Sequence, residues 1–232
     1  QNNNRIFDRK ICENIVNTLK GKKAIIKNIN KTNKRYYAPN LYDLTELQRD
    51  ANRIYNFSAK ETLSIMQRLY EYHKILTYPR TDSKYITTDI VPTLKERLEA
   101  IKVSPYLMYV NNILAKEIKV NKSFVDDSKV TDHHAIIPTE EKVNLSRLTD
   151  KEIKIYDLVV KRFLAVLYPP HEYEQAIIDL QIQDEKFIAK GKKIINNGWK
   201  DIYNYQEDEI NEYQLLPNFH SGEELKIDKI EV

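Results

Sequence analysis

The spacing of apolar residues changes twice along this chain, and the change limits the folds that it can adopt. Between about residues 40 and 167, apolar residues recur at the spacing of an α-helix. Before and after this stretch, segments such as "KAIIKNIN", "EYEQAIIDLQI" and "EKFIAKG" favour strands. The sequence therefore predicts an α+β fold in which a mainly helical domain, residues 39–167, is inserted into a β-rich domain made of residues 1–38 and 168–232.

Local signals predict where several elements begin and end. Pairs with the spacing of a capping box precede three apolar patterns, and these pairs are Thr45 with Gln48, Ser58 with Glu61, and Thr149 with Glu152. Ser104 and Pro105 resemble a cap and a first-turn proline. The prolines in "YPP" (168–170) should end the last helix. Nearer the N-terminus, "KICENIVNTLKGKK" (10–23) is a short amphipathic segment, and we expect a turn in "NKTNKRYY" (30–37).

Composition excludes some classes of site. The chain has 232 residues and a single cysteine, Cys12, which rules out an internal disulfide and a metal cage made only of cysteines. No apolar run approaches twenty residues and no secretory signal is visible, so we expect no membrane partner and a cytoplasmic location. Four glycines leave no glycine-rich phosphate loop. A net charge of +3 permits a nucleic-acid partner without requiring one.

The segment "LTYPRTDSKYI" (76–86) contains a candidate nucleophile. The proline at 79 biases Tyr78 towards an extended conformation, in which Tyr78 and Arg80 point to the same side. A phenol is a poor nucleophile at neutral pH, and a neighbouring guanidinium favours the phenolate and can hold a phosphate. Taken alone, Tyr78 can equally be a half-buried aromatic residue that ends a helix, with Thr81, Asp82 and Ser83 as turn residues.

A second segment, "TDHHAIIPTE" (131–140), places His133 and His134 before a short apolar run. An imidazole can donate to a phosphate or act as an acid near pH 7. Zinc is a less favoured alternative, because adjacent histidines seldom share one metal and Cys12 is remote in sequence. The pair can also be structural and pack within a loop.

Taken together, these segments resemble the type IA DNA topoisomerases, most closely the topoisomerase III branch. Three further segments also resemble the family, and all of them occur in the family's order along the chain. They are "LYDLTELQRDANRIYNFSAKETLSIMQRLYE" (41–71), "LAVLYPPHEYE" (164–174) and "GWKDIY" (198–203), so the resemblance extends over about residues 40–203. It implies that residues 39–167 form the gate domain with the catalytic tyrosine, and that the flanking residues form a β-rich arch.

The resemblance also implies roles for individual residues. Tyr78 would attack single-stranded DNA to form a 5′-phosphotyrosine, Arg80 would position the phosphate, and His133 occupies the histidine position of the motif. Thr81, Asp82 and Ser83 would shape the loop and contact the cut strand, and His134 occupies a more variable position. A strand would then pass through the break, and religation would need no ATP because the bond energy is kept in the covalent link.

Two parts of the family pattern are expected to lie elsewhere. No acidic Asp-x-Asp cluster accompanies a strand, so the magnesium ion of the complete enzyme would be bound by an N-terminal metal-binding domain outside this chain. The DNA-binding domain that helps to hold the single strand is likewise expected outside it. We therefore expect no metal ligands here and little cleavage by the isolated fragment.

Further contacts with the DNA backbone are expected from Arg49, Arg53 and Lys84, although each can simply be a solvated side chain. Two other functions stay open at this point. One is a non-catalytic DNA-binding or scaffold module of the same architecture, and the other is a structural helical protein with a chance motif. Convergence of Tyr78, Arg80 and His133 in space would separate them.

Overall fold

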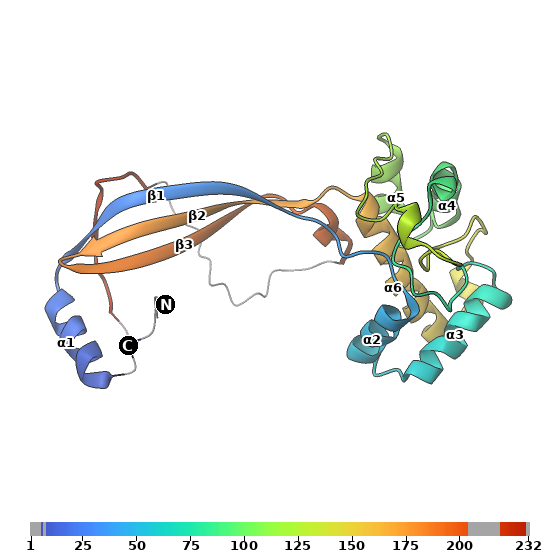
Figure 1. Cartoon of the computed structure of the whole chain (residues 1–232), viewed down its shortest axis with the longest axis horizontal. Helices are drawn as coiled ribbons and strands as arrows, with labels where there is room; N and C mark the ends of the chain where they lie inside the picture. The colour runs from blue at the N-terminus through green and yellow to red at the C-terminus, as the bar shows by residue number, and fades with distance from the viewer. Residues whose placement is uncertain (1–5, 7, 204–218, 231–232) are drawn as a thin grey trace. The chain divides into compact units, whose positions relative to one another are not determined.

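The computed structural model describes residue 6, residues 8–203 and residues 219–230 (Figure 1). Contacts divide the described residues into two compact units. The sheet unit comprises those of Gln1–Arg35, Glu172–Asn196 and Glu207–Val232, and the helical unit comprises Tyr36–His171 together with those of Asn197–Gln206. The chain thus leaves the sheet unit after its first strand, builds the helical unit and then returns. The predicted α+β fold is confirmed.

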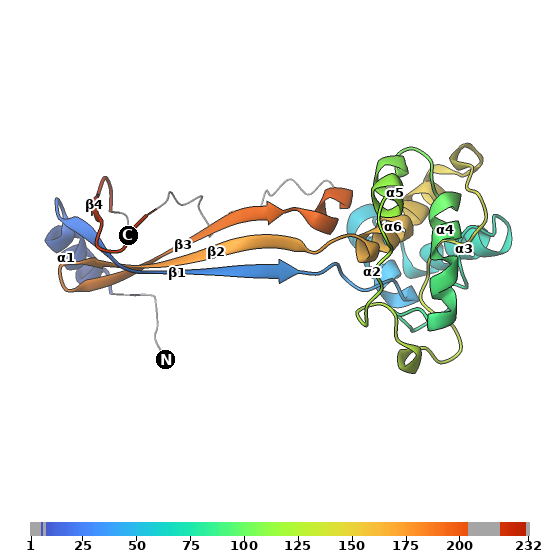
Figure 2. The same cartoon turned by 90° about the horizontal axis from the view of Figure 1, so that it is seen from above.

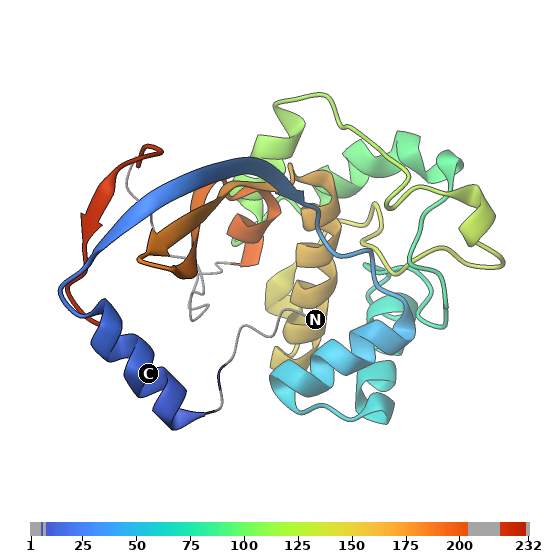
Figure 3. The same cartoon turned by 60° about the vertical axis from the view of Figure 1, so that its left-hand side comes forward.

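The sheet unit is a four-stranded sheet with the strand order β3-β2-β1-β4 (Figure 3). Strands β2 and β3 form an antiparallel hairpin in which Ile182 pairs with Glu185, and β4 pairs antiparallel with the start of β1. Its elements are α1 (Arg9–Leu19), β1 (Lys23–Tyr36), β2 (His171–Ile182), β3 (Glu185–Asn196) and β4 (Glu224–Lys226).

Few side chains are buried in the sheet unit. Leu19, Ala24 and Ile182 form one buried cluster, with partly buried residues of α1, β2 and the C-terminal segment packed against it, and Ile26, Ala176 and Ile178 are also buried. Along β3, the apolar residues Ile188 and Ile195 are 59% and 56% exposed. The sheet is therefore held mainly by its backbone ladders rather than by a thick apolar core.

The helical unit surrounds one long helix, α6, which packs against α2, α3, α5 and the short helix η4 (Figure 2). One face of α6 is fully buried, as expected from its apolar periodicity. The elements are α2 (Leu44–Tyr55), α3 (Ala59–Glu71), α4 (Leu94–Ala100), α5 (Leu107–Leu114) and α6 (Asp150–Leu167), with 3₁₀ turns η1 (Thr88–Thr93), η2 (Asp127–Lys129), η3 (Leu145–Arg147) and η4 (Gly198–Tyr203).

Two of the predicted helix starts are confirmed. Ser58 caps α3 by accepting from the Glu61 N–H at 3.1 Å, and Thr149 and Glu152 form a complete capping box at the start of α6. Helix α6 ends at Leu167, where the prolines of "YPP" begin to interrupt the backbone pattern.

Other local predictions were wrong for physical reasons. Asp43, not Thr45, caps α2, and its carboxylate accepts from the Glu46 N–H at 2.7 Å. Helix α5 begins at Leu107, so Pro105 is not its first residue. The expected turn at 30–37 is instead the second half of β1, where exposed polar side chains hide the strand pattern.

The helical unit begins at Tyr36 rather than at residue 39 and reaches His171 rather than residue 167, and one further segment differs from the predicted division. Residues 197–206 were expected in the β-rich part, whereas their described residues belong to the helical unit. Trp199 is 5% exposed and donates its indole N–H to the Tyr36 carbonyl at 2.9 Å. Gly198 has a φ of +56° beside the carbonyls of Pro169 and Pro170, where a side chain would not fit.

None of the helices in the described part of the chain is long and apolar enough to cross a membrane.

Candidate active site

Tyr78 lies in an extended segment that is tied to the histidine segment by backbone hydrogen bonds. The Thr77 N–H donates to the Ile137 carbonyl at 3.0 Å, and the Ile137 N–H donates to the Thr77 hydroxyl at 3.0 Å. Leu76 forms an isolated antiparallel bridge with Pro138. These contacts hold two stretches together that are separated by about sixty residues of sequence.

Burial alternates along the residues that follow Tyr78. Pro79, Thr81 and Ser83 are buried, whereas Arg80 and Asp82 are exposed. This alternation is the one expected for extended chain, in which neighbouring side chains point to opposite sides. Arg80 and Asp82 are therefore presented outwards while the intervening residues anchor the loop.

The hydroxyls of Thr81 and Ser83 shape this loop. Thr81 donates to the His133 carbonyl at 2.8 Å and accepts from the Ser83 N–H, and Ser83 donates to the Lys129 carbonyl at 2.9 Å. Both side chains are nearly inaccessible, at 8% and 5% exposure. Both hydroxyls form hydrogen bonds within the protein, and this geometry fits the prediction that Thr81 and Ser83 shape the loop. Among the three loop residues, Asp82 is the exposed one.

The Tyr78 ring contacts two other aromatic rings. The His133 ring lies with its centroid 4.3 Å away at an interplanar angle of 40°, and the Tyr70 ring lies 5.5 Å away at 82°. Tyr78 is half-buried and His133 is exposed, so the phenol is not enclosed in an apolar interior. No role was predicted for Tyr70 from the sequence.

An open pocket of about 580 Å³ adjoins the His133 ring. Its lining includes Arg80, Thr81, Asp82 and His133 from the two motif segments, together with Asp43, Leu44, Thr45, Leu63, Thr131 and Asp132. Ring contact joins Tyr78 to His133, and the shared pocket joins His133 to Arg80. Within the described part of the chain, Arg80 has no ion-pair partner, so its guanidinium is available to an external anion.

Lys84 lies close to the same pocket but faces carboxylates. Its Nζ is 3.6 Å from Asp43 Oδ2 and 3.8 Å from Glu46 Oε1. Arg49 pairs with Glu46, and Arg53 pairs with Asp50 at 2.8 Å, both from exposed positions. A DNA phosphate would therefore compete with these carboxylates, and contact with DNA stays a prediction for all three cations.

His134 is directed back towards its own segment. Its Nδ1 is 2.8 Å from the Ala135 carbonyl, which fits donation from an Nδ1–H tautomer. Burial lowers the pKa of His134, and the nearby positive charge of Arg97 acts in the same direction. The neutral ring therefore fits an anchoring position, and contact of His134 with DNA stays a prediction.

Two buried charged residues stabilise the helical unit, and of these the sequence indicated only Glu152, as part of a capping box. Arg97 is 6% exposed, donates to the Pro138 carbonyl at 2.8 Å and pairs with Glu140 at 2.6 Å. Glu152 is 2% exposed and pairs with Arg68 at 2.8 Å. Burial opposes ionisation of Glu152, but hydrogen bonds from Thr149 and the Arg68 charge outweigh it and lower its pKa to about 2.

The described residues do not fit a metal site. No group of three or more histidine, cysteine, aspartate or glutamate side chains gathers in residues 6, 8–203 and 219–230 in a way that could hold an ion. Of the carboxylates that line the pocket, Asp43 caps α2 and faces Lys84, and Asp82 and Asp132 are exposed. The mechanism proposed below therefore uses no metal ion bound by this part of the chain.

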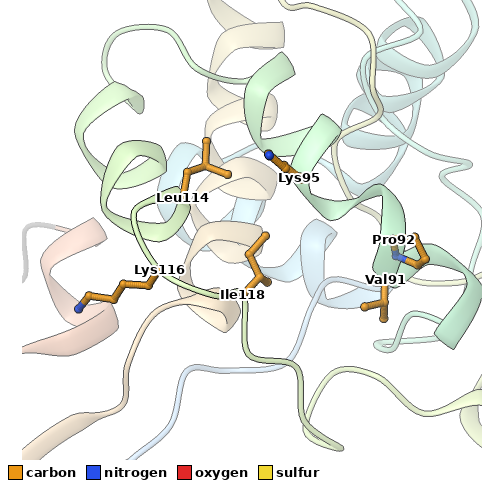
Figure 4. Close-up of a pocket in the computed structure, with 6 residues that line it drawn as sticks. All are labelled: Val91, Pro92, Lys95, Leu114, Lys116 and Ile118. Carbon is orange, nitrogen blue, oxygen red and sulfur yellow. The ribbon is translucent and has the colours of Figure 1, made fainter.

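A second pocket differs in character from the first. It is about 330 Å³ in volume and is lined by Val91, Pro92, Lys95, Leu114, Lys116 and Ile118 (Figure 4). In Figure 4 the Lys116 side chain extends away from Leu114 and Ile118. This lining offers no phenol, imidazole or carboxylate for catalysis, and the pocket lined by Arg80 and His133 is the stronger candidate for an active site.

Comparisons with known proteins show the family to which the chain belongs. The sequence model of a family described as DNA topoisomerase matches residues 1–232. DNA topoisomerase 3 of Bacillus cereus is 54% identical over 230 residues, covering 97% of this chain and 32% of the relative. DNA topoisomerase 3 of Bacillus subtilis is 51% identical over 227 residues, covering 96% and 31%.

A solved structure shares the fold. Full-length topoisomerase I from Thermotoga maritima superposes with a TM-score of 0.69 at 23% identity, covering 97% of this chain and 36% of that chain. The chain spans about a third of the length of the curated relatives named above. On the family match and these relatives, the chain belongs to the type IA DNA topoisomerases and is similar to their topoisomerase III members.

Proposed function

We propose that this chain is the part of a topoisomerase III-like enzyme that carries the nucleophile, Tyr78, and that the complete enzyme cleaves, passes and reseals single-stranded DNA. The observation that supports this most is the ring contact of Tyr78 with His133, which lines one open pocket together with Arg80. Family membership supplies the reaction class, and the Arg80 guanidinium, which has no ion-pair partner among the described residues, supplies a place for a phosphate.

The chemistry is an exchange of one phosphodiester for another. The Tyr78 oxygen attacks phosphorus and loses its proton, while the bond from phosphorus to the 3′-oxygen breaks and that oxygen leaves as a hydroxyl after gaining a proton. The 5′-phosphate stays on the tyrosine, and the reverse reaction reseals the strand. Because an ester bond is conserved at every stage, the cycle needs no ATP.

Arg80 and His133 have separate tasks in this proposal. Arg80 neutralises the phosphate and stabilises the charge that develops around phosphorus. His133, exposed and in ring contact with Tyr78, donates an N–H to a phosphate oxygen or a proton to the leaving 3′-oxygen. Arg49, Arg53, Lys84 and Asp82 are proposed to contact the strand away from the reacting phosphate.

We further propose that the isolated chain cleaves poorly. It spans about a third of the length of its relatives. We assign magnesium binding to segments of the complete enzyme outside that third. A cytoplasmic location stays a prediction.

The test uses a chimaeric enzyme in which residues 1–232 replace the matched third of DNA topoisomerase 3 from Bacillus cereus. The enzyme is mixed with magnesium and a single-stranded oligonucleotide labelled at either the 3′ or the 5′ end, and the reaction is stopped with detergent. A 5′-phosphotyrosine leaves the 3′-end label on the protein and releases the 5′-end label. Tyr78→Phe should abolish labelling.

Tyr85→Phe is the matched control, because Tyr85 lies in the same segment and its hydroxyl contacts Lys129 at 3.1 Å. It should label like the parent. Labelling that persists in Tyr78→Phe would overturn the assignment of the nucleophile. A parent chimaera that binds the oligonucleotide but never becomes labelled would favour the alternative, a non-catalytic DNA-binding module.

A further inference from the structure

Tyr70 is placed against Tyr78 by the turn that joins them. It lies in the last turn of α3, and its ring meets the Tyr78 ring edge-on, with centroids 5.5 Å apart. This is a favourable arrangement for an aromatic pair, because the positive edge of one ring faces the negative face of the other. The Tyr70 side chain is 37% exposed. No hydrogen bond of its hydroxyl is formed within the described residues.

The backbone between the two tyrosines is fixed at several points. The Ile75 N–H donates to the Leu69 carbonyl at 3.0 Å, and the Thr139 hydroxyl donates to the Lys74 carbonyl at 2.6 Å. Leu69, next to Tyr70, is completely buried. The Tyr70 ring is therefore presented from a rigid helix, and the Tyr78 segment is folded back onto that helix.

We propose that Tyr70 is a positioning residue that restricts the Tyr78 ring to the orientation needed for attack. The proposal rests on the function proposed above. The Tyr78 ring has two aromatic neighbours, Tyr70 and His133. His133 is exposed, and in that mechanism it donates an N–H to the phosphate or a proton to the leaving oxygen. Tyr70 supplies the contact that need not move during the reaction. Misplacing a nucleophile by about 1 Å can cost a hundredfold in rate.

The positioning role depends on the ring and not on the phenol oxygen. Tyr70→Phe keeps the edge-on contact, Tyr70→Leu keeps apolar bulk without a ring, and Tyr70→Ala removes both. The competing explanation is that Tyr70 stacks on a DNA base, which would change binding rather than the chemical step.

Tyr72 provides a matched control for base stacking. It is two residues away and 78% exposed, and its ring packs on His73 with centroids 4.9 Å apart rather than on Tyr78. Tyr72→Ala removes a more accessible aromatic ring without removing a ring contact of the nucleophile.

The kinetic test measures single-turnover adduct formation and oligonucleotide affinity in the chimaeric enzyme. We expect Tyr70→Phe and Tyr72→Ala to stay within about twofold of the parent rate. Tyr70→Ala and Tyr70→Leu should slow adduct formation about tenfold, the scale of one lost aromatic pair, with affinity changed less than twofold. An unchanged rate in Tyr70→Ala, or a loss of affinity equal to the loss of rate, would overturn the proposal.

A second measurement requires no activity. The 232-residue chain is prepared with 3-fluorotyrosine at position 78 alone, and its ¹⁹F spectrum is recorded. The parent and Tyr70→Phe should give one sharp resonance from a single ring environment, and Tyr70→Ala should give a broadened or split signal. Identical spectra for all three would contradict the proposed restriction.

The two proposals fail in different ways. Labelling that survives Tyr78→Phe refutes the nucleophile and leaves the ¹⁹F result intact as a statement about ring orientation. Loss of labelling in Tyr78→Phe combined with a full rate in Tyr70→Ala retains the nucleophile and refutes the positioning role.

Discussion

The helical unit and the sheet unit are stabilised by different means. The helical unit buries a continuous set of large side chains around α6, including Tyr156 and Phe163, whereas the sheet unit has a small buried cluster of Leu19, Ala24 and Ile182 and few other buried apolar residues. The candidate site belongs to the unit with the larger core. Its reactive segment has little regular secondary structure, so that core and the buried hydroxyls of Thr81 and Ser83 must hold it in place.

The largest effect is expected from a cavity in α6. Phe163 is 1% exposed, and Phe163→Ala should lower the free energy of unfolding of the helical unit by about 3–5 kcal/mol. Leu19→Ala, in the thinner core of the sheet unit, should cost only about 2 kcal/mol because partial collapse of that core is easier. Denaturant unfolding with hydrogen exchange would assign each loss to its unit. Equal losses of unfolding free energy in the two units would contradict the difference between their cores.

A smaller effect is expected from the buried carboxylate at the start of α6. Glu152→Ala removes half of the capping box and leaves Arg68 without its partner, which should cost about 3 kcal/mol. Glu61→Ala is the control, since Glu61 pairs with Lys151 at the surface, and it should cost less than about 1 kcal/mol.

The Glu152 contribution should depend on pH in a defined direction. Its pKa in the folded protein is about 2, below the ordinary value of 4.5, so the ionised form favours folding. The stabilisation is fully present above about pH 4.5 and is lost as the pH falls towards 2. The difference in stability between the parent and Glu152→Ala should therefore shrink over that window. A stability difference that stays constant over this pH window would show that ionisation of Glu152 is not the source of its contribution.

Two glycines allow a third comparison between the units. At Gly198, in the helical unit, φ is +56° and an added Cβ would lie 2.3 Å from the Pro170 carbonyl oxygen, so Gly198→Ala should cost at least about 2 kcal/mol. At Gly21, in the sheet unit, φ is +73° and the space is open, so Gly21→Ala should cost about 1 kcal/mol. Thermal unfolding measures both. The reverse order would contradict the packing around Gly198.

The smallest effect is expected on the outer strand of the sheet. Ile188 on β3 is 59% exposed, and Ile188→Thr keeps a β-branched side chain while removing apolar surface. Stability should change by no more than about 0.5 kcal/mol. A loss above 2 kcal/mol would mean that this face is covered in solution.

The sequence predicted those features that depend on neighbouring residues. The caps at Ser58 and Thr149 were found because a side chain and a backbone N–H three residues later form a local motif. The α+β order followed from the change in apolar spacing. The cap at Asp43 was missed because Thr45 and Gln48 have the same spacing two residues further along the chain.

Features that depend on distant contacts were not predictable in this way. Half of β1 carries exposed polar residues whose strand conformation comes from its neighbours in the sheet. Tyr70 looked like one more apolar residue of its helix, because only the turn after α3 brings Tyr78 against it. Arg97 holds the histidine segment from about forty residues away, with no local signal.

The most direct test of the central claim is to identify the residue that becomes attached to DNA. The chimaeric enzyme is trapped on an oligonucleotide with magnesium, the DNA is digested to a short remnant, and the protein is cleaved and analysed by tandem mass spectrometry. We predict a nucleotide remnant on Tyr78, in a peptide containing "TYPRTDSK". A remnant on any other residue, with Tyr78 unmodified, would contradict the account.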